Sequence, residues 1–595
     1  MQGPKFLIGM IPLTFVMEHS KILAVTSPYS NISAQTRQKI SGHVIRPELM
    51  EAPVGFTSGA GAAVDNIQVD KRSGAVRTMS GNLFESVLES HKITQEAIVA
   101  LAWKFIREKG SFLGLNPSEL AVDNDALHVD DDVQFVKFRI YEDGKRNLDA
   151  SVDLQFKRGQ LVQVINNSFQ EATWEATGKN PPSLDEIKAK ILNESSDLML
   201  VDQVESLGTF IRVRERPDGY EKVTIQRYLV SDQGEQRFFF DYDLDHEEFL
   251  AITPLRVHYA PVTPGADEPN GQTRGDVHPR WYNDTAVAAH LPFVGVSLGT
   301  STVSTDEKGL FTAAAGQKPK MTGLRGTFVK VKPMTGAALN VEGVLDGERW
   351  SLSYVKNASN RPFADKDMAQ TMAYVHTQKV IDYASKYIKS PWFQKSLNVN
   401  VNLGQTCNAY WDGTTTNFFS AGGRCANTAL IADVIYHEWG HGLDANTGGI
   451  DDGAYSEGFG DIVSVLMTGS NVLGVGFFTN GDPVRDLEPN KVYPKDRGEV
   501  HAEGLIIGGT FWDLYKSLKV KYNDEKAKDL LSAYAFKSVM TASRYTDVYK
   551  ALLVIDDDDQ NLGNGSPNFC EINAAFTDHG LAKKDPKCKE APAAL

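Results

Sequence analysis

The chain has 595 residues and a formal net charge of -15, with 42% of its residues hydrophobic and 23% charged. One hydrophobic core rarely serves a chain of this length, so several globular domains are expected. The excess of acidic residues argues against a nucleic-acid backbone as partner, because phosphate binding needs clustered positive charge. It fits a protein of the extracellular medium or the periplasm.

Residues 1–25 contain a candidate signal peptide. Lys5 precedes an apolar stretch at residues 6–17 that is too short to span a bilayer. A small-residue cleavage site is not evident and Glu18 interrupts the stretch, so a start-site artefact or a buried strand is the alternative. No later segment reaches the length of a membrane helix, so the mature protein is expected to stay outside the membrane.

Residues 26–260 are predicted to form an α+β unit. Apolar residues recur there with helical spacing in some segments and alternate with polar residues, as in half-buried strands, in others. The predicted helices are residues 93–109 and 183–192, and the predicted strands are residues 133–140, 150–156, 222–230 and 236–242.

Two shorter regions separate this unit from the last one. Residues 261–290 are rich in Pro, Gly and Asp, which indicates a linker that could hold an activation cut. Residues 291–360 combine short strands with glycine turns and predict a small β-sandwich. A long amphipathic helix at residues 367–389 is then predicted to open the final domain, residues 361–590.

A His-Glu-x-x-His motif lies in an apolar run of helical character within this final domain. Residues four apart share one helical face, so His437 and His441 can bind the same metal ion. A catalytic zinc ion needs a third protein ligand and an open position. Glu457, near the start of a second predicted helix, is the candidate for this third ligand.

Two further acidic residues accompany these ligands. Asp461 lies one helical turn after Glu457, where it can accept a hydrogen bond from the outer nitrogen of a ligand histidine. Glu438 directly follows the first histidine. Because zinc lowers the pKa of a bound water to about 7, Glu438 is the candidate general base that takes its proton.

The four cysteines occur as two local pairs, Cys407 with Cys425 and Cys570 with Cys588. Three pairings are possible, and the short loops favour the sequential pairing over the others and over free buried thiols. Such bonds would indicate an oxidising compartment.

The acidic, glycine-containing loop at residues 556–566 offers oxygen ligands that calcium prefers. Its spacing is not that of a complete EF-hand loop, and a solvated loop without an ion is the alternative. Calcium is therefore a second candidate ion besides zinc.

These motifs together resemble the thermolysin and fungalysin group of zinc peptidases, in which two histidines and a downstream glutamate bind the metal. The segment Asn-Ala-Tyr-Trp-Asp at residues 408–412 is similar to the edge-strand segment of that group. The resemblance implies that Asn408 and Ala409 hold a substrate peptide in extended form, as an added strand at a sheet edge.

The resemblance extends to three residues further along the chain. Arg485 is similar to the arginine that binds the substrate carbonyl and braces the pocket in this group. His501 is similar to its second catalytic histidine, and Asp496 to the acidic partner of that histidine. Donors placed in advance around that oxygen would stabilise the negative charge that develops during attack on a peptide bond.

The resemblance also implies a fold and a maturation route. It implies a multidomain α+β protein whose thermolysin-like catalytic domain, residues 361–590, has a mixed sheet and a mainly helical C-terminal lobe. Residues 26–260 are similar to the propeptide of these peptidases, which implies that they inhibit and chaperone the catalytic part. A substrate-binding accessory domain is the alternative for this region.

The sequence thus predicts a secreted zinc metalloendopeptidase, made as a proenzyme, that cleaves protein or peptide substrates. Two alternatives remain open. One is a non-catalytic, zinc-containing adhesin or binding protein on a peptidase fold, and the other is an aminopeptidase of narrow specificity.

Overall fold

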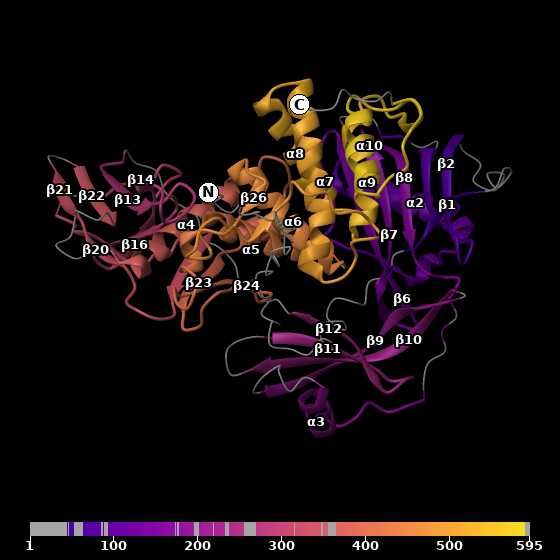
Figure 1. The fold of residues 1–595 in the computed structure, drawn as a ribbon, viewed down its shortest axis with the longest axis horizontal. Coiled ribbons are helices and arrows are strands. Elements are labelled where there is room, and N and C mark those ends of the chain that lie inside the picture. Colours follow the sequence, from indigo (N-terminus) through magenta and orange to yellow (C-terminus); the bar gives the residue numbers. More distant parts are fainter. Residues whose placement is uncertain are drawn as a thin grey trace, which may run out of the picture.

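The computed structural model describes residues 45, 47–52, 63–84, 87–88, 93–172, 174, 178–194, 201–217, 219–232, 237–254, 269–314, 316–346, 349–354, 364–450 and 452–588. Within these ranges the chain is a mixed α+β protein. A β-rich region lies at one end, helices lie in the middle, and the N-terminal sheet lies beside the last helices (Figure 1). The candidate signal peptide, residues 1–25, and residues 261–268 of the expected linker lie outside the described residues.

The N-terminal part is built on one large sheet. Its strand order is β1-β2-β3-β8-β7-β9-β10-β11-β12, with β6 paired to β7 and the short β4 and β5 paired to β6. The strands are β1 (Leu49–Glu51), β2 (Ala63–Asp70), β3 (Val76–Asn82), β4 (Leu120–Val122), β5 (His128–Val129), β6 (Val133–Glu142), β7 (Lys145–Lys157), β8 (Gln160–Asn167), β9 (Val201–Arg216), β10 (Gly219–Asp232), β11 (Arg237–Asp243) and β12 (Glu248–Pro254). The four strands predicted here are confirmed as β6, β7, β10 and β11.

Both helices predicted for this part are confirmed. Helix α2 (Gln95–Lys109) begins where the Thr94 side chain accepts a hydrogen bond from the Ala97 N–H, and it buries its apolar stripe against the sheet. Helix α3 (Leu184–Glu194) packs Ile187 and Ile191 into a second, smaller cluster with residues of β10 and β11.

The β-rich region begins inside the expected linker. Strands β13 (Gly271–Val277) and β14 (Val287–His290) pair in one sheet, so the prediction of a linker is wrong for this part of residues 261–290. Glycine serves close packing here, because a Cβ at Gly275 would lie 2.9 Å from the Thr371 side chain. The other short strands of the region are β15 (Gly295–Leu298), β16 (Ser301–Ser304), β17 (Leu310–Phe311), β18 (Pro319–Thr322), β20 (Asn340–Glu342), β21 (Val344–Asp346) and β22 (Arg349–Tyr354).

This β-rich region is not a separate sandwich at residues 291–360. Strand β19 (Val329–Pro333) pairs in parallel with β23 (Leu397–Leu403), in a mixed sheet of order β19-β23-β25-β24 that crosses the expected boundary. Strands β24 (Ala409–Trp411) and β25 (Thr415–Phe419) complete that sheet. Apolar residues from β13 to β22 join one hydrophobic cluster with the helices that follow, so the two regions share a core.

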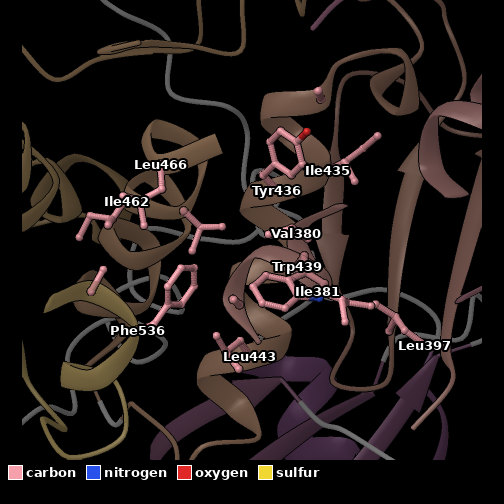
Figure 2. Close-up of a cluster of buried hydrophobic side chains, with 14 of the residues drawn as sticks. Val380, Ile381, Leu397, Ile435, Tyr436, Trp439, Leu443, Ile462, Leu466 and Phe536 are labelled. Atoms are coloured by element: carbon pink, nitrogen blue, oxygen red, sulfur yellow. The ribbon is translucent and has the colours of Figure 1, made fainter. Parts of the chain in front are cut away.

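Helices dominate the chain after residue 431. They are α5 (Ala432–Ala445), α6 (Gly453–Thr468), α7 (Val500–Lys521), α8 (Asp524–Ser538), α9 (Tyr545–Asp556) and α10 (Phe569–Asp578), with a small β26 (Val472–Leu473) and β27 (Arg485–Asp486) hairpin between α6 and α7. The earlier helix α4 (Asp365–Ala384) lies in the sequence between β19 and β23 of the mixed sheet. Figure 2 shows the core around α5, where Trp439 and Leu443 share one buried cluster with Ile381 and Leu397 and α6 contributes Ile462 and Leu466. Helix α5 is therefore held from several sides.

The N-terminal sheet packs on the C-terminal helices, with β7 against α9 (Figure 1). Val133, Phe135 and Val162 of this sheet belong to the hydrophobic cluster of the helical part. Polar side chains also cross the contact: Lys137 Nζ donates to Ser543 Oγ (2.8 Å), Gln155 Nε2 to Thr541 Oγ1 (2.9 Å), Lys157 Nζ to the Ile555 carbonyl (3.2 Å) and Arg158 Nη1 to the Asp558 carbonyl (2.7 Å).

The sequential disulfide pairing is confirmed. Cys407 pairs with Cys425, and Cys570 pairs with Cys588. Two such bonds are consistent with an extracellular protein. Among the described residues, every helix is too short or too polar to cross a lipid bilayer.

Candidate metal centre

The packing of α5 and α6 decides which way the site residues face. Trp439 is fully buried on the core side of α5 (Figure 2), which leaves the two histidines of the motif half-buried toward α6. Glycines let the two helices approach each other, because a Cβ at Gly440 would lie only 3.0 Å from the Cα of Gly460. A Cβ at Gly460 would likewise lie 2.7 Å from His437 Nδ1.

Three side chains converge between these helices. His437 Nε2 and His441 Nε2 are 3.1 Å apart, and the Glu457 carboxylate lies 3.3 Å from the first nitrogen and 3.5 Å from the second. Within the described part of the chain, these three form a group whose ligand atoms all lie within 4.8 Å of one another. Two imidazole nitrogens and one carboxylate oxygen are a donor set that suits zinc, so the residues present fit this ion.

Asp461 and Arg485 surround this group with charge. Asp461 Oδ1 lies 3.0 Å from His437 Nδ1 and 2.6 Å from Arg485 Nη1, and Arg485 Nη2 lies 3.0 Å from Glu457 Oε2. Burial would raise the pKa of Glu457, but its neighbours, His501 foremost, outweigh it and hold that pKa well below its usual range. The pKa of Asp461 is lowered too, because Arg485 outweighs the effect of burial. Both acids are thus held as carboxylates.

Arg485 lies against the acids of this group. The resemblance implies that its guanidinium binds the substrate carbonyl and braces the pocket. The side chain is 9% exposed and donates to Asp461 and Glu457, as a bracing residue would, and its contact with substrate stays a prediction. Two buried carboxylates close to one another repel, and a forked cation between them removes that repulsion. The contacts therefore assign Arg485 to holding the acids of the centre.

The acidic neighbour of His501 is Glu499, and the expectation of Asp496 is corrected. His501 Nδ1 contacts Glu499 Oε1, while its Nε2 lies 3.4 Å from Glu457 Oε1. The Asp496 carboxylate instead accepts the Val492 N–H at 2.8 Å. Glu499 also caps α7, so an acidic residue at a helix start two positions before a histidine was the signal that could have found it.

Glu438 is buried beside these residues, with 6% of its surface exposed. Burial, to which the charge of Glu457 adds, raises the pKa of Glu438 to about 7 against the opposing effect of His437. A carboxyl group with a pKa near neutrality can both accept and return a proton.

Asn408 and Ala409 lie where the mixed sheet ends. Strand β24, which Ala409 opens, pairs with β25 and is the last strand in the order β19-β23-β25-β24. Asn408 precedes it and is buried, and its Oδ1 has no hydrogen-bond partner among the described residues. Helix α5 packs against β24, so this sheet edge and the metal centre are neighbours.

His441 has a partner that sequence reasoning missed. Its Nδ1 lies 2.9 Å from Ser456 Oγ, and the same hydroxyl contacts the Asp444 carboxylate. The position of a serine directly before Glu457 was the available signal, since neighbours of a ligand often contact the other ligands.

The acidic side chains of the loop at residues 556–566 do not converge on one point as metal ligands would. Both Asp556 oxygens accept protein hydrogen bonds, from Tyr534 and from Asn568 among others. Asp559 similarly accepts from Asn561 and Asn564. Asp556 and Asp559 are thus satisfied by the chain, while Asp557 Oδ1 has no hydrogen-bond partner among the described residues. No close group of three His, Cys or acidic side chains occurs in this described loop, so the arrangement does not support calcium.

Comparisons with known proteins add little to this geometry. No protein-family model matches the chain, and no curated protein matches it. One solved structure that is similar is the precursor of protealysin, a metalloproteinase from Serratia proteamaculans, with 17% sequence identity and a TM-score of 0.33 over 44% of this chain and 90% of that chain. A likeness this distant carries no argument, so the site itself has to support any statement about function.

Proposed function

We propose that the chain is a secreted zinc metalloendopeptidase made as a proenzyme. The convergence of His437, His441 and Glu457 on one point supports this, because it reproduces the ligand set that a His-Glu-x-x-His motif with a downstream glutamate requires. A zinc ion bound by such ligands supplies a Lewis acid that acidifies water and polarises a carbonyl group.

Glu438 is the proton carrier in this proposal. Its carboxylate takes a proton from the attacking water and then delivers it to the nitrogen of the departing amine, so the peptide bond breaks without releasing an unprotonated amide anion. The raised pKa of this buried carboxyl group, about 7, suits both transfers near neutral pH.

His501 and the edge strand orient the substrate. A peptide that adds to β24 in extended form would form main-chain hydrogen bonds with Ala409 and bring its scissile carbonyl toward α5. Asn408, directly before β24, would help Ala409 to hold this peptide. His501 Nε2, near Glu457, is the donor for the developing oxyanion, with Glu499 holding the opposite ring nitrogen.

The N-terminal unit is the propeptide in this proposal, with residues 1–25 as signal peptide and residues 26–260 as inhibitor and chaperone of the catalytic part. Its contact with the C-terminal helices combines apolar packing with many hydrogen bonds. In this proposal the activation cut lies in the part of residues 261–290 that precedes Gly271, where β13 begins.

The variant Glu438→Gln tests the proposal. It should retain one equivalent of zinc by elemental analysis, while casein hydrolysis falls by at least about 10²–10⁴-fold, the usual contribution of a general base. Glu525→Gln, on the exposed surface of α8, is the matched control and should behave as wild type.

Three outcomes would point elsewhere. Processed wild-type protein, freed of residues 26–260, that binds zinc but cleaves nothing would indicate a non-catalytic binding protein. Cleavage limited to N-terminal residues in a mixed peptide library would indicate an aminopeptidase. Appreciable activity in Glu438→Gln would remove Glu438 from its role.

A further inference from the structure

We propose that Asp444 and Ser456 form a relay that orients His441 for metal binding, an inference that rests on the proposed zinc site. The two residues come from different helices, since Asp444 lies near the end of α5 and Ser456 lies in the first turns of α6. Neither is a ligand, so both act on the metal only through His441.

Hydrogen bonds link His441, Ser456 and Asp444 in series. His441 Nδ1 lies 2.9 Å from Ser456 Oγ, and Ser456 Oγ contacts Asp444 Oδ2. The other oxygen of Asp444 accepts the Ile450 N–H at 2.8 Å. Asp444 is almost completely buried, with 1% of its surface exposed, so little water competes for these hydrogen bonds.

The chemistry of the three groups sets the direction of the relay. Both oxygens of Asp444 accept hydrogen bonds, so the single hydroxyl proton of Ser456 is donated to Asp444 Oδ2. The serine oxygen is then free to accept, and His441 must donate its Nδ1–H to it. This tautomer leaves the lone pair of His441 on Nε2, the nitrogen that faces His437 and Glu457.

The two ligand histidines are therefore oriented by different means. His437 contacts the Asp461 carboxylate directly at 3.0 Å, and Asp461 shares its charge with Arg485. For His441, the carboxylate acts through one intervening hydroxyl. Removal of that hydroxyl should free the His441 ring without touching the charge pairs around His437.

Asp444 also fixes the short loop between α5 and α6. Its bond to the Ile450 N–H closes this loop on the end of α5. Within the loop, Gly448 approaches the N-terminal unit so closely that a Cβ there would lie 2.4 Å from the Ala126 Cβ. Both oxygens of the Asp444 carboxylate are thus held by hydrogen bonds, which keeps Ser456 Oγ within hydrogen-bonding distance of His441 Nδ1.

The test measures zinc binding to the full-length chain by competition with a chromophoric chelator. Ser456→Ala and Asp444→Asn should each raise the zinc dissociation constant by about 10–100-fold, the usual effect of losing a partner of a ligand histidine. Ser456→Thr keeps the hydroxyl and should restore the affinity to nearly that of wild type. The control is Ser464→Ala, which removes a buried hydroxyl of α6 that donates to the Asp433 and Gly460 carbonyls and should leave the affinity unchanged.

Replacing zinc by cobalt adds a measurement that does not change when a variant merely loses stability. The visible absorption bands of bound cobalt report ligand geometry, so they should shift in Ser456→Ala and stay constant in Ser464→Ala. Thermal unfolding of the metal-free variants identifies any that fail to fold, and the relay is then judged from Ser456→Thr against Ser456→Ala.

The outcomes separate the relay from the function on which it rests. Tight zinc binding by wild type with an unchanged constant in Ser456→Ala overturns the relay and leaves the proposed peptidase intact. Absence of stoichiometric zinc in the wild type overturns the zinc site itself.

Discussion

Two buried groups of charged residues in this molecule respond to burial in opposite ways. At the metal centre, the pKa values of Glu457 and Asp461 are lowered and the pKa of Arg485 is raised, so all three keep their charge. At the contact between the N-terminal sheet and α9, which we call the interface cluster, burial dominates the pKa values of Asp153, Asp547 and Lys550. The interface cluster consists of Lys137, Asp153, Arg544, Asp547 and Lys550.

In the interface cluster, burial raises the pKa of Asp153 to about 6 and also raises the pKa of Asp547. Burial lowers the pKa of Lys550 to about 8. The distances explain the difference from the metal centre. Arg485 lies 2.6 and 3.0 Å from its two carboxylates, whereas Lys137 and Asp153 are 3.6 Å apart and Arg544 and Asp547 are 3.9 Å apart.

Close, forked contacts offset the cost of taking charges out of water, and loose contacts do not. The metal centre is therefore built to keep its charges in place. The interface cluster leaves part of that cost uncompensated, which fits the proposed propeptide, a unit that must leave its partner after the chain is cut.

The largest effect should follow from removing the cation of the metal centre. Arg485→Met leaves two buried carboxylates without their partner, and loss of one member of a buried ion pair usually costs about 3–5 kcal/mol. Denaturant unfolding of the metal-free protein, followed by tryptophan fluorescence, should show this decrease in the free energy of unfolding.

The control for this prediction is Arg424→Met. Arg424 is exposed and lies over the Phe478 ring at 5.1 Å, a contact worth about 0.5–1 kcal/mol. Equal losses in the two arginine variants would show that the metal centre does not depend on its cation.

Local sequence patterns were sufficient to predict part of the metal centre and part of the fold. The spacing of His437 and His441 predicts one helical face, and Glu457 follows at the start of a second helix, as observed. The helices and strands predicted within residues 93–242 are confirmed because each has its own apolar period.

Features that depend on tertiary contacts were predicted wrongly. Glu499 and Asp496 are both acidic residues close before His501, and only the start of α7 decides which of them reaches it. Residues 271–290 have a composition typical of linkers, but pairing with β22 and packing on α4 place strands there. The amino-acid composition of a segment indicates how flexible it is as a free chain. It does not indicate which strands or helices the folded protein places beside it.

A second prediction concerns pH and the interface cluster. The pKa of Asp153 is about 6 in the folded chain against an ordinary value of 3.8, so the folded state favours the protonated acid. This contribution is fully present below pH about 4 and is lost as the pH rises through 6, with a total of about 3 kcal/mol. Asp153→Asn mimics the protonated form and should avoid the loss.

Unfolding curves of wild type and Asp153→Asn between pH 4 and pH 8 check this sign. The two proteins should be about equally stable at pH 4, and the variant should be the more stable by up to about 3 kcal/mol at pH 8. A variant that is less stable at pH 8 would mean that the Lys137 contact does compensate Asp153, and the contrast between the two clusters would disappear.

The smallest effect is expected in the acidic loop, where hydrogen bonds rather than counter-charges satisfy a carboxylate. Asp556 accepts from Tyr534 Oη and Ser566 Oγ at 2.6 Å, and from the main-chain and side-chain nitrogens of Asn568 at 2.6 and 2.7 Å. Asp556→Asn places an amide N–H against these donors and should cost about 1–3 kcal/mol. The exposed Asp558→Asn should cost nearly nothing.

Calcium distinguishes a loop that binds a metal ion from a loop whose carboxylates are satisfied by protein hydrogen bonds. Because the Asp556 oxygens already accept protein hydrogen bonds, millimolar calcium should leave the melting temperature of the wild type unchanged. A rise that Asp556→Asn abolishes would mean that the loop rearranges around an ion. The loop would then belong with the metal centre, as a place where the chain holds carboxylates ready for a cation instead of satisfying them itself.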